Sequence, residues 1–587
     1  MRRLARILLV TLALIGLLAV ALVGLGIWGA VQIADKVEPP LPKRMVLTLD
    51  LEGKFHEAGA GDPFAKLSGE KVYVLRKAVE AIDAAGSDPR VVGLLATMGK
   101  TSLSLAAAQE LRDAVGRFRA SGKPAVVFAE TMGEFGAGTL DYYLATGFGQ
   151  LWLQPSGDVG LTGVLAESPF VKGTLDLLGI KPEFSGRWEY KSAIELFTET
   201  GFTQPHKQNL GRLLDSWTGQ MVDGIASARK LPPDKVRALL GNGPFVAAEA
   251  LSAGLVDKLG YREAALQAVT GGGAPAKEVD AADYAGALPR SHGTKVAVVV
   301  GTGAIHRGDS DHGFGAADDF GSKTIAKAFR DAIDDKEVKA IIFRIDSPGG
   351  SYVASDTVWN EVRRAREAGK PVVASMGGVA ASGGYFVAMG ADRVIAQPGT
   401  ITGSIGVFSG KMVMADFWKK IGVSWDELHR GDNAAMWSVN QPFSPQAWAR
   451  VNAVLDRIYA DFTTKAAEGR HIPPAKMDEL ARGRIWSGAD AKAAGLVDSL
   501  GGWREAVASA RELARLPADA PVELVAFPRP SKPWELLAET MSGGSQVRGM
   551  VRAVRVLEPV LARLDMLVRP GDATLMMPPL VVDGGRP

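Results

Sequence analysis

Two serines lie close together in a glycine-rich stretch of the sequence, residues 379–406. A predicted short helix and a predicted strand separate Ser382 from Ser404. Small neighbours let a substrate backbone approach closely, and Ser382 is flanked on both sides by Ala380, Ala381, Gly383 and Gly384. The free N–H groups at a helix start can also stabilise an oxyanion. The stretch therefore suits a nucleophilic serine, although a serine at a helix start often serves only as an N-cap.

The chain contains the same domain twice. Residues 87–96 (SDPRVVGLLA) match residues 334–343 (DDKEVKAIIF), and residues 253–260 (AGLVDKLG) match residues 494–501 (AGLVDSLG). The spacing between matched segments stays between 241 and 247 residues. A repeat of this length indicates two copies of one domain rather than a solenoid.

The two copies differ at the residues that could do chemistry. In the alignment of the copies, Ser382 faces Thr139, so the first copy lacks this serine. Lys191, in a distinctive first-copy stretch at residues 184–193 (FSGRWEYKSA), faces Ala434. One copy therefore carries two well-placed serines and the other carries a lysine, which indicates a division of labour across an interface between them.

The pattern of apolar segments predicts an α/β fold with a mostly parallel sheet in each copy. Strands are predicted at residues 45–51, 91–96, 125–129, 296–300 and 338–345, and helices at 72–85, 103–120, 324–333 and 357–368. We expect a first domain at 45–270, a linker at 271–293, a second domain at 294–515 and a C-terminal extension at 516–587. An apolar and basic segment at 547–568 suits either a packed extension or a helical pair for a partner or a membrane surface.

The N-terminus predicts one transmembrane helix. Residues 1–6 form a basic tail with three arginines, and residues 7–34 contain no charged residue, which is enough to cross a bilayer. The alternative is a cleavable signal peptide, because residues 19–21 (AVA) resemble a cleavage site. The apolar run continues past that site, so we expect an uncleaved, single-pass anchor with a cytoplasmic N-terminus.

Composition excludes several classes of protein. Basic and acidic residues nearly balance, 67 against 65, and no basic run with interleaved aromatics suggests nucleic-acid binding. The absence of cysteine excludes thiol catalysis and disulfides. The seven histidines are scattered and form no pair at metal-ligand spacing. We therefore expect no metal, no cofactor and no nucleic-acid partner.

A second glycine-rich turn follows a predicted buried strand at residues 346–351 (DSPGGS). Ligands bind beyond the carboxyl ends of parallel strands, where glycine N–H groups can contact anions. Proline and glycine are also the usual residues of an ordinary turn. This stretch by itself therefore favours the ordinary strand-to-helix turn.

Four motifs together resemble the long form of bacterial signal peptide peptidase, the protease IV family. They are SPGGS at 347–351, MGGVAASGGY at 376–385, TGSIGV at 402–407 and YKSA at 190–193. The resemblance covers residues 45–515 and the anchor. It implies a Clp protease/crotonase-like fold in each copy, preceded by the transmembrane helix.

The resemblance also implies a function. Ser382 is expected to be the nucleophile and Lys191 the general base, with Ser404 orienting the lysine and Gly349 supplying an oxyanion N–H. The expected activity is Ser-Lys endopeptidase cleavage of apolar peptides, remnant signal peptides in particular. The family organisation implies a homotetramer at the inner membrane, with its catalytic domains on the periplasmic side.

A lysine can act as a base only when it is neutral, so it must be desolvated or crowded by positive charge. Trp188, Tyr190 and Ala193 are apolar neighbours suited to that burial. Two other functions remain open at this point. The chain could be a non-catalytic membrane scaffold, or a crotonase-like acyl-CoA enzyme on the same fold.

Overall fold

The computed structural model describes residues 40–58, 71–289, 291–310, 319–529, 574–577 and 581–582. The predicted anchor at 7–34 and the apolar and basic segment at 547–568 lie outside these ranges. Within the described ranges no helix has both the length and the apolar character needed to cross a membrane.

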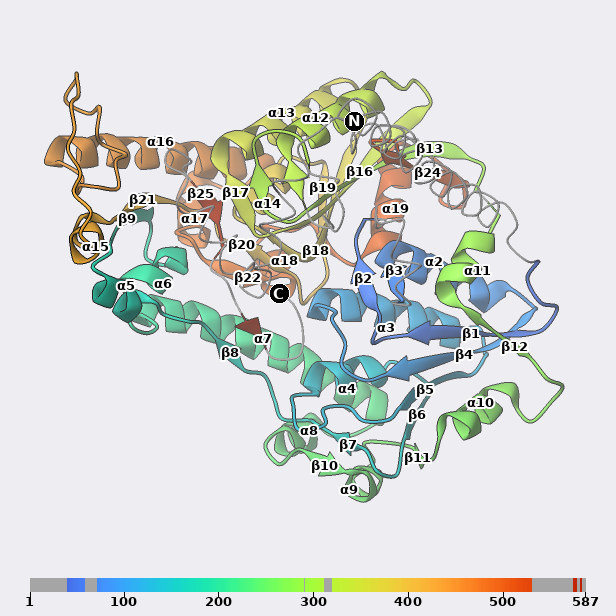
Figure 1. Ribbon diagram of the computed structural model, residues 1–587. Coiled ribbons are helices and arrows are strands. Elements are labelled where there is room, and N and C mark those ends of the chain that lie inside the picture. Colours follow the sequence, from blue (N-terminus) through green and yellow to red (C-terminus); the bar gives the residue numbers. More distant parts are fainter. Residues whose placement is uncertain are drawn as a thin grey trace, which may run out of the picture.

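Each copy contains a main sheet, and the two main sheets have the same strand order (Figure 1). The first sheet is parallel throughout and has the order β12-β1-β4-β5-β6-β11. Its strands are β1 (Met45–Asp50), β4 (Val91–Met98), β5 (Ala125–Ala129), β6 (Gln150–Leu153), β11 (Lys258–Leu259) and β12 (Lys277–Asp280). This part of the fold confirms the predicted parallel α/β domain.

The second sheet repeats this order as β24-β13-β16-β18-β19-β23. A side branch runs from β18 to β20 and then, antiparallel, to β22. The strands are β13 (Thr294–Thr302), β16 (Val338–Ser347), β18 (Val372–Ala381), β19 (Arg393–Ala396), β20 (Ile401–Gly403), β22 (Ile485–Ser487), β23 (Ser499–Leu500) and β24 (Val522–Phe527). The tandem duplication read from the sequence is therefore present in the fold.

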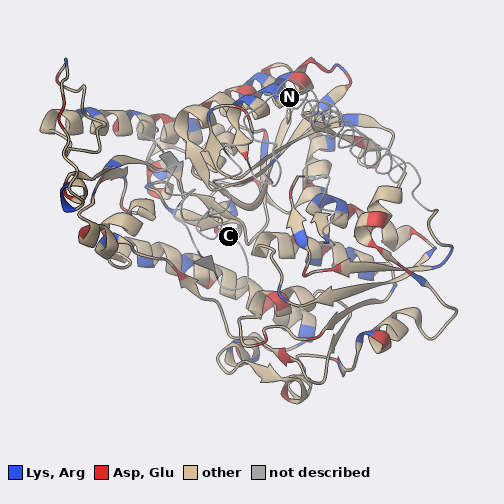
Figure 2. Ribbon diagram, viewed as in Figure 1, with Lys and Arg blue, Asp and Glu red and all other residues tan. Residues whose placement is uncertain are grey.

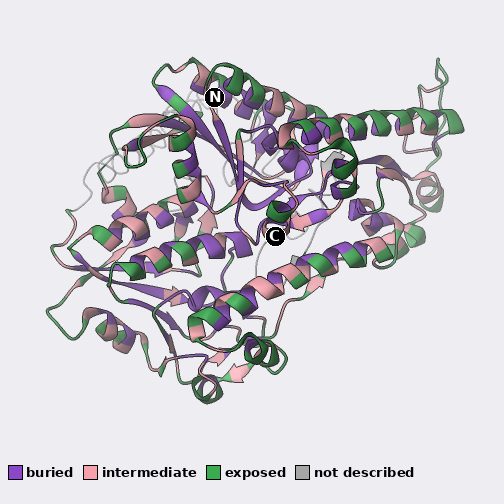
Figure 3. Ribbon diagram, turned by 180° about the vertical axis from the view of Figure 1, so that it is seen from behind, coloured by how far each residue is buried: buried purple, intermediate pink, exposed green. Residues whose placement is uncertain are grey.

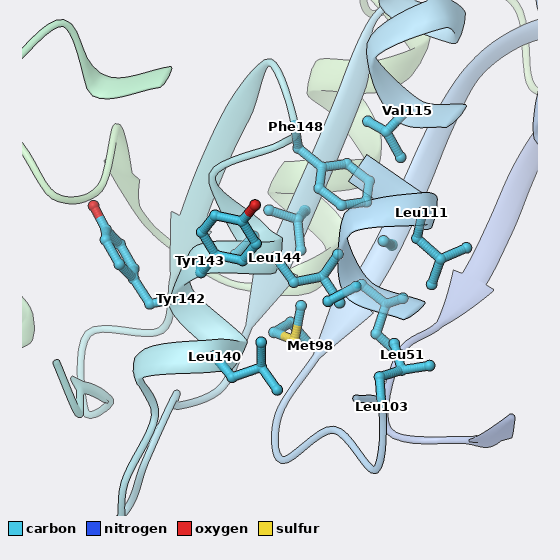
Figure 4. Packing of buried hydrophobic residues seen from close by; sticks show 14 of the residues in the cluster. Leu51, Met98, Leu103, Leu111, Val115, Leu140, Tyr142, Tyr143, Leu144 and Phe148 are labelled. Carbon is cyan, nitrogen blue, oxygen red and sulfur yellow. The ribbon is translucent and has the colours of Figure 1, made fainter. Parts of the chain in front are cut away.

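Central strands of both sheets are continuous apolar runs because helices cover both of their faces. All five residues of β5 and all ten of β18 are buried. Figure 4 shows how Leu111 of α3, Leu140 of α4 and Phe148 of the turn after α4 pack together with Met98 from β4 in the first copy.

The helices also occur in matched pairs. The first copy contains α2 (Leu75–Ser87), α3 (Leu105–Ala120), α4 (Thr139–Ala145), α7 (Gln204–Arg229), α8 (Pro233–Leu240), α9 (Ala247–Ser252) and α10 (Arg262–Thr270). Their counterparts are α12 (Ser322–Asp334), α13 (Tyr352–Glu367), α14 (Gly383–Ala388), α16 (Pro445–Arg470), α17 (Pro474–Leu480), α18 (Gly488–Ala493) and α19 (Trp503–Leu513).

The long helices α7 and α16 are built alike. Each has 26 residues and a proline in its first turn, and each N-cap side chain, Thr203 or Ser444, accepts a backbone N–H. Both expose one face and bury the other (Figure 3). The buried face of α7 reaches the second copy, where Ser216 Oγ lies 2.8 Å from Ser487 Oγ.

The predicted domain boundaries differ from the structure in two places. The expected linker at 271–293 contains β12 and α11 (Ala281–Ala287), and β12 completes the edge of the first sheet. The expected extension contains β24, which has the same place in the second sheet. An edge strand is held by backbone pairing on one side only, so it lacks the apolar run that identifies a central strand, as KEVD in β12 illustrates.

One predicted helix start is also displaced. The expected helix at 72–85 begins with β3 (Val72–Val74), which pairs with β2 (Lys54–His56), and α2 starts only at Leu75. The three residues VYV favour a strand because two of them are β-branched and one is aromatic.

A third sheet joins the copies and has the order β15-β14-β17-β25-β21-β9. Its last two strands are β21 (Val407–Val413) of the second copy and β9 (Lys181–Arg187) of the first, paired antiparallel over seven residues. The other strands are β14 (Ile305–His306), β15 (Phe320–Gly321), β17 (Gly349–Ser351) and β25 (Thr574–Met576). Figure 1 shows β9 beside β21, far from the first sheet.

A buried ion cluster also joins the copies. The Arg344 guanidinium on β16 contacts Glu57 at 2.6 Å and Glu110 of α3 at 3.0 Å, and all three side chains are buried. Figure 2 shows acidic and basic residues interspersed on helices and loops of both copies. The cluster therefore places one cation of the second copy against two anions of the first, away from water.

We expect Arg344→Met to lower the free energy of unfolding by about 3–5 kcal/mol, because it leaves two carboxylates buried without their cation. Urea unfolding followed by tryptophan fluorescence measures this loss. Arg363→Met is the control, since Arg363 and its partner Glu367 are both exposed. That change should cost less than about 1 kcal/mol. Equal losses in the two variants would contradict the role of the cluster.

Candidate active site

Three side chains predicted from the sequence meet at the boundary between the copies. Lys191 Nζ lies 2.8 Å from Ser382 Oγ, 3.0 Å from Ser404 Oγ and 3.0 Å from the Ser404 carbonyl oxygen. Lys191 is only 2% exposed and both serines are fully buried. The first copy thus supplies an amine to two hydroxyl groups of the second.

Ser382 lies at the turn between β18 and α14. Its backbone N–H donates to the Gly403 carbonyl, and its own carbonyl accepts the Phe386 N–H. Its φ of +54° is unusual for a residue with a side chain. The hydroxyl makes no capping hydrogen bond to the helix. The structure therefore does not support the N-cap interpretation of Ser382, and the hydroxyl faces the lysine instead.

The two glycines after Ser382 are required by close packing. A Cβ atom on Gly384 would lie 2.5 Å from the Ser347 carbonyl oxygen, and one on Gly383 would lie 3.1 Å from Gly349 Cα. The first distance leaves no room for a side chain, and the second is tighter than nearly all real Cβ contacts. The glycines thus let the start of α14 lie directly against the turn that carries Gly349, which brings the two glycine-rich motifs together.

Ser404 follows β20 and also has a positive φ, +51°. Its backbone N–H donates to the Arg484 carbonyl, and β20 itself is held between β18 and β22. Two neighbouring non-glycine residues of one site thus have sparsely populated backbone conformations. Such strain persists only where the surroundings enforce it, and it is frequent at functional sites.

Lys191 reaches the serines because the segment after β9 lies on the second copy. The Tyr190 N–H donates to the Arg482 carbonyl, and Arg187 and Glu189 pair with Asp456 and Arg482 of the second copy. The two charged residues that precede Lys191 in the chain are thus engaged by the second copy, and Lys191 itself is buried.

Gly483 lets the second copy approach Lys191 closely. Its φ is +86°, and a Cβ atom there would lie 2.4 Å from the Lys191 backbone nitrogen. The sequence analysis did not single out this glycine. The only local signal is its position in GRIW at 483–486, shortly before a strand. Its role depends on contact with a residue of the other copy, which no local pattern shows.

The expected apolar surroundings of Lys191 are present with one exception. Tyr190 and Ala193 are buried, but Trp188 is half exposed and its ring packs edge-on against Tyr459. Trp188 therefore does not desolvate the amine as expected. Close to the site, the Arg484 guanidinium lies 3.6 Å from the centre of the Tyr190 ring and fixes that ring in place.

Burial lowers the pKa of Lys191 well below its ordinary value. The three oxygens in contact with the amine belong to hydroxyl and carbonyl groups, so they add no negative charge that would favour the ammonium form. A neutral amine has two N–H donors and one lone pair. It can donate to both Ser404 oxygens and accept the Ser382 O–H, and this arrangement is suited to general-base chemistry.

Gly349 lies near this group, in β17, with a φ of +104°. Its N–H donates to Ser347 Oγ at 3.2 Å. Its expected role as an oxyanion donor thus stays a prediction, since a substrate oxygen would have to replace the Ser347 hydroxyl. Sequence reasoning did not consider Ser347 as a partner for this N–H.

The corresponding place in the first copy has no such chemistry. The Thr139 hydroxyl accepts the backbone N–H groups of Thr162 and Gly163 at 3.2 and 3.0 Å. Thr139 is buried in its own copy. The contrast between Ser382 and Thr139 in the aligned copies thus has a structural counterpart. Ser382 contacts Lys191 of the other copy, whereas Thr139 makes only local backbone hydrogen bonds in its own copy.

Comparison with known proteins identifies the family. The sequence pattern of peptidase family S49 matches residues 117–272 and 364–517, one segment in each copy and together more than half of the chain. The chain belongs to peptidase family S49. The S49 match in both copies agrees with the duplicated fold described above.

Relatives support this assignment along most of the chain. The chain is 31% identical to a chloroplast serine protease SPPA of Arabidopsis thaliana over 82% of its own length and 72% of that protein's. It is 32% identical to Protease 4 of Salmonella typhi over 84% of its length and 82% of that protein's. This S49 protein is therefore a serine peptidase. That activity disfavours the two alternative functions, a non-catalytic membrane scaffold and a crotonase-like acyl-CoA enzyme.

A solved structure of a ClpP1 variant of Listeria monocytogenes aligns with 36% of this S49 chain and 94% of its own, at 14% identity and a TM-score of 0.23. A likeness this low decides nothing about the fold. The Clp protease/crotonase-like assignment of each copy therefore stays a prediction from the motifs.

We expect the activity of this S49 peptidase to rise with pH to a plateau. Only the neutral amine accepts a proton, so the rate falls as pH drops through the lowered pKa of Lys191 and is retained above it. The plateau should begin well below pH 10.5, the ordinary value for lysine. Initial rates of peptide cleavage in a constant-ionic-strength buffer series measure the profile. A rate that does not change from acid to alkaline pH would contradict a lysine base.

Proposed function

We propose that this S49 peptidase is an endopeptidase that cleaves extended apolar peptides with Ser382 as nucleophile and Lys191 as general base. The observation that carries the proposal is the 2.8 Å contact between Lys191 Nζ and Ser382 Oγ in a fully buried site. A serine is a weak nucleophile without a base in hydrogen-bond reach, and the Ser-Lys pair is a recognised variant of the catalytic triad.

Acylation follows from this geometry. Ser382 Oγ attacks the carbonyl carbon of the scissile bond while its proton passes to the lone pair of Lys191. The carbonyl electrons move to the oxygen and form a tetrahedral oxyanion. When this intermediate collapses, the C–N bond breaks and the Lys191 ammonium gives its proton to the leaving amine, so the first product departs and an ester on Ser382 remains.

Deacylation uses the same base. Lys191 takes a proton from a water molecule, the resulting hydroxide attacks the ester carbon, and the proton returns to Ser382 Oγ when the acid product leaves. Ser404 holds the amine through its hydroxyl and its carbonyl oxygen throughout. Since neither oxygen is charged, Ser404 orients the lysine without stabilising its protonated form.

Backbone N–H groups are the proposed oxyanion donors. Gly349 N–H would turn from Ser347 Oγ to the substrate oxygen. The N–H of Gly383, the first residue of α14 and the residue directly after the nucleophile, is the second proposed donor, as the sequence suggested for the N–H groups at this helix start. One such donor contributes about 2.7–4 kcal/mol to transition-state stabilisation in other proteases.

We propose remnant signal peptides as the physiological substrates. The motifs of the active site resemble those of bacterial signal peptide peptidases, and a signal peptide has an uncharged core of about 7–15 residues. An anchored peptidase would meet such peptides where they are released, in the membrane. Side chains like Leu or Ala are therefore expected at the cleaved bond, and a strict preference for a charged residue there would contradict this.

An internally quenched Leu- and Ala-rich peptide tests the dyad. We expect Ser382→Ala and Lys191→Ala to lower its cleavage by at least about 10³-fold, because nucleophile and base act as a unit. Ser404→Ala removes an orienting hydrogen bond and should cost roughly tenfold. Circular dichroism should be unchanged in all three.

Ser509→Ala is the control for the dyad test, because Ser509 is a buried serine on α19, far along the chain from the site motifs. It should keep the activity of the unmodified protein. Near-normal cleavage by Lys191→Ala would overturn the dyad.

We also propose a homotetramer, and the third sheet supports it. Each edge of β21 is paired, one with β25 and the other with β9. Its counterpart in the first copy, β8 (Ala166–Glu167), pairs with β26 (Val581–Val582). The segment that corresponds to β9 is 424–430, and it is exposed, with Trp425 at 60% and Leu428 at 96%.

In the proposed oligomer, residues 424–430 of one chain pair with residues 164–170 of the next, as β9 pairs with β21 inside a chain. A head-to-tail contact of this kind forms a ring when the rotations between neighbouring chains add up to a full turn. We expect Trp425→Asp with Leu428→Asp to lower the mass measured by light scattering in detergent, because two charges would enter the interface. Leu251→Asp, at an exposed position of α9, should leave the mass unchanged. A single-chain mass for the unmodified protein would overturn the oligomer.

We propose that residues 7–34 anchor the peptidase in the inner membrane, with the catalytic copies on the periplasmic side. The uncharged apolar run and the arginines before it support this orientation. We expect external protease to digest the catalytic copies in spheroplasts without lysis. Digestion only after lysis would overturn the orientation.

A further inference from the structure

One short segment of the second copy contacts both sides of the active site. The segment is residues 482–485, which lead into β22. The Arg482 carbonyl accepts the N–H of Tyr190, the residue before the proposed base. The Arg484 carbonyl accepts the N–H of Ser404, which orients that base. The segment therefore links the backbone of the first copy that carries the lysine to the backbone of the second copy that carries the serine.

Residues 482–485 are themselves held from both copies. The Gly483 N–H donates to the Ile405 carbonyl of the second copy at 2.8 Å. From the first copy, the side-chain amide of Asn209 on α7, oriented so that both of its polar groups are satisfied, pairs with the N–H and the carbonyl of Ile485 at 3.0 and 3.1 Å. The segment thus has a fixed position at the interface.

The Arg484 side chain adds a contact of its own to the first copy. Its guanidinium lies 3.6 Å from the centre of the Tyr190 ring, close enough for a strong cation–π interaction. Within the described part of the chain the guanidinium pairs with no carboxylate, and its Nε is buried without a hydrogen-bond acceptor. An unpaired buried donor costs stability and is uncommon in folded proteins. The arginine is therefore placed for the tyrosine ring and not for an ion pair.

Tyr190 is consequently fixed at three points. Its N–H donates to the Arg482 carbonyl, its hydroxyl donates to Gln208 of α7 at 3.0 Å, and its ring lies against the Arg484 guanidinium. Lys191 directly follows Tyr190 in the chain. A tyrosine that cannot shift or rotate fixes the backbone from which the lysine side chain starts, so the contacts of Arg484 bear on the position of the amine.

The first copy has no counterpart of this arginine. At the spacing of 241 residues shared by the matched segments near the end of each copy, Arg484 corresponds to Gly243. Gly243 faces Leu161 as Arg484 faces Ser404, and Leu161 is the aligned counterpart of that serine. A Cβ atom on Gly243 would lie 2.1 Å from the Leu161 carbonyl oxygen, so no side chain can stand there. The arginine thus occurs only in the copy that carries the reacting serine.

We propose that Arg484 is a positioning residue for peptide cleavage, whose side chain fixes Tyr190 and thereby Lys191 while its carbonyl fixes Ser404. This inference rests on the proposed peptidase function. One residue then sets the distance between the amine and the group that orients it. A displacement of about 1 Å in such a site can lower the rate about 10²-fold, even when the altered residue does not touch the reacting atoms.

Arg484→Met in the full-length protein removes the guanidinium and keeps the backbone carbonyl. We expect kcat for the Leu- and Ala-rich peptide to fall about 10- to 100-fold with KM unchanged, because the base moves and the peptide-binding surface does not. Arg76→Met is the matched control. Arg76 of α2 lies over the ring of Trp503 on α19 at 5.8 Å, so it too joins an arginine of one copy to an aromatic ring of the other. Its kcat should be unchanged.

The pH profile distinguishes displacement of the lysine from a simple loss of folded protein. A smaller folded fraction lowers the rate equally at every pH, whereas a loosened and better hydrated Lys191 keeps its proton to higher pH. We therefore expect the plateau of Arg484→Met to begin at a higher pH than that of the unmodified protein. The neighbouring ion pairs of Arg187 with Asp456 and of Glu189 with Arg482 are the same in both proteins.

Variants of the tyrosine separate the stacking contact from the charge of the arginine. Tyr190→Leu removes the ring and leaves the guanidinium, and we expect the same loss of kcat and the same upward shift of the plateau. Tyr190→Phe keeps the ring and should recover most of the rate. The double variant Arg484→Met with Tyr190→Leu should lose no more than either single variant, since both remove one contact. A pH shift in Arg484→Met alone, or additive losses, would overturn the proposal.

Modification of the lysine gives a readout that needs no turnover. Reductive methylation followed by mass spectrometry of the Lys191 peptide measures how well the amine is shielded. We expect faster methylation of Lys191 in Arg484→Met and Tyr190→Leu than in the unmodified protein or in Arg76→Met. Matching circular dichroism spectra show that the variants are folded.

The outcomes separate this inference from the proposed function. Unchanged kcat and unchanged methylation in Arg484→Met, together with an inactive Lys191→Ala, would overturn the positioning role while the peptidase reaction stands. Faster methylation of Lys191 in the variants without cleavage by any form would support the positioning role and overturn the proposed reaction.

Discussion

The antiparallel pairing of β9 with β21 is the interaction on which the active site depends. The two reacting side chains are 191 residues apart in the chain and come from different copies of the domain. Seven paired residues hold the strand of the first copy against the second. Lys191 follows this strand by only a few residues, so any change in the register or attachment of β9 would move the base away from Ser382.

A second constraint is the burial of an amine without a carboxylate partner. Desolvation lowers the pKa of Lys191, and the oxygens around it are uncharged. The unfolded chain binds a proton at this lysine up to about its ordinary pKa, whereas the folded site does not. Between the lowered and the ordinary pKa, stability therefore increases with pH and is lost as pH falls. The site thus contributes reactivity at some cost in stability, as do the positive φ values of both serines.

Duplication explains how such a site can exist. Both copies keep the same sheet order and the same paired helices, so each can form a stable core without the catalytic residues. Thr139 uses its hydroxyl for two local backbone hydrogen bonds. The fold depends on the periodic apolar residues of each copy, whereas the chemistry depends on a few residues at one interface. The catalytic residues can therefore differ between the copies without loss of the fold. The Arg344 cluster and α7 add further contacts between the copies.

The sequence by itself determined the class of fold and the duplication, and it singled out Ser382, Lys191 and Ser404, which the structure brings together. The oxyanion role of Gly349 stays a prediction. Apolar strands alternate with amphipathic helices in both halves, and this local pattern follows directly from burial. The contrast between Ser382 and Thr139, and between Lys191 and Ala434, appeared as soon as the halves were aligned. The edge strands β12 and β24 were not predicted, since their backbone pairing leaves little trace in side-chain pattern.

Only the tertiary structure decided how these residues meet. It showed that Ser382 faces a lysine instead of capping a helix, that Gly349 N–H is engaged by Ser347, and that Trp188 does not bury the amine. It also placed Gly483 against Lys191 and β25 between β17 and β21. Each of these depends on contact between segments distant in the chain. Local sequence records the propensity of a segment, and it carries no information on which distant backbone will lie against it.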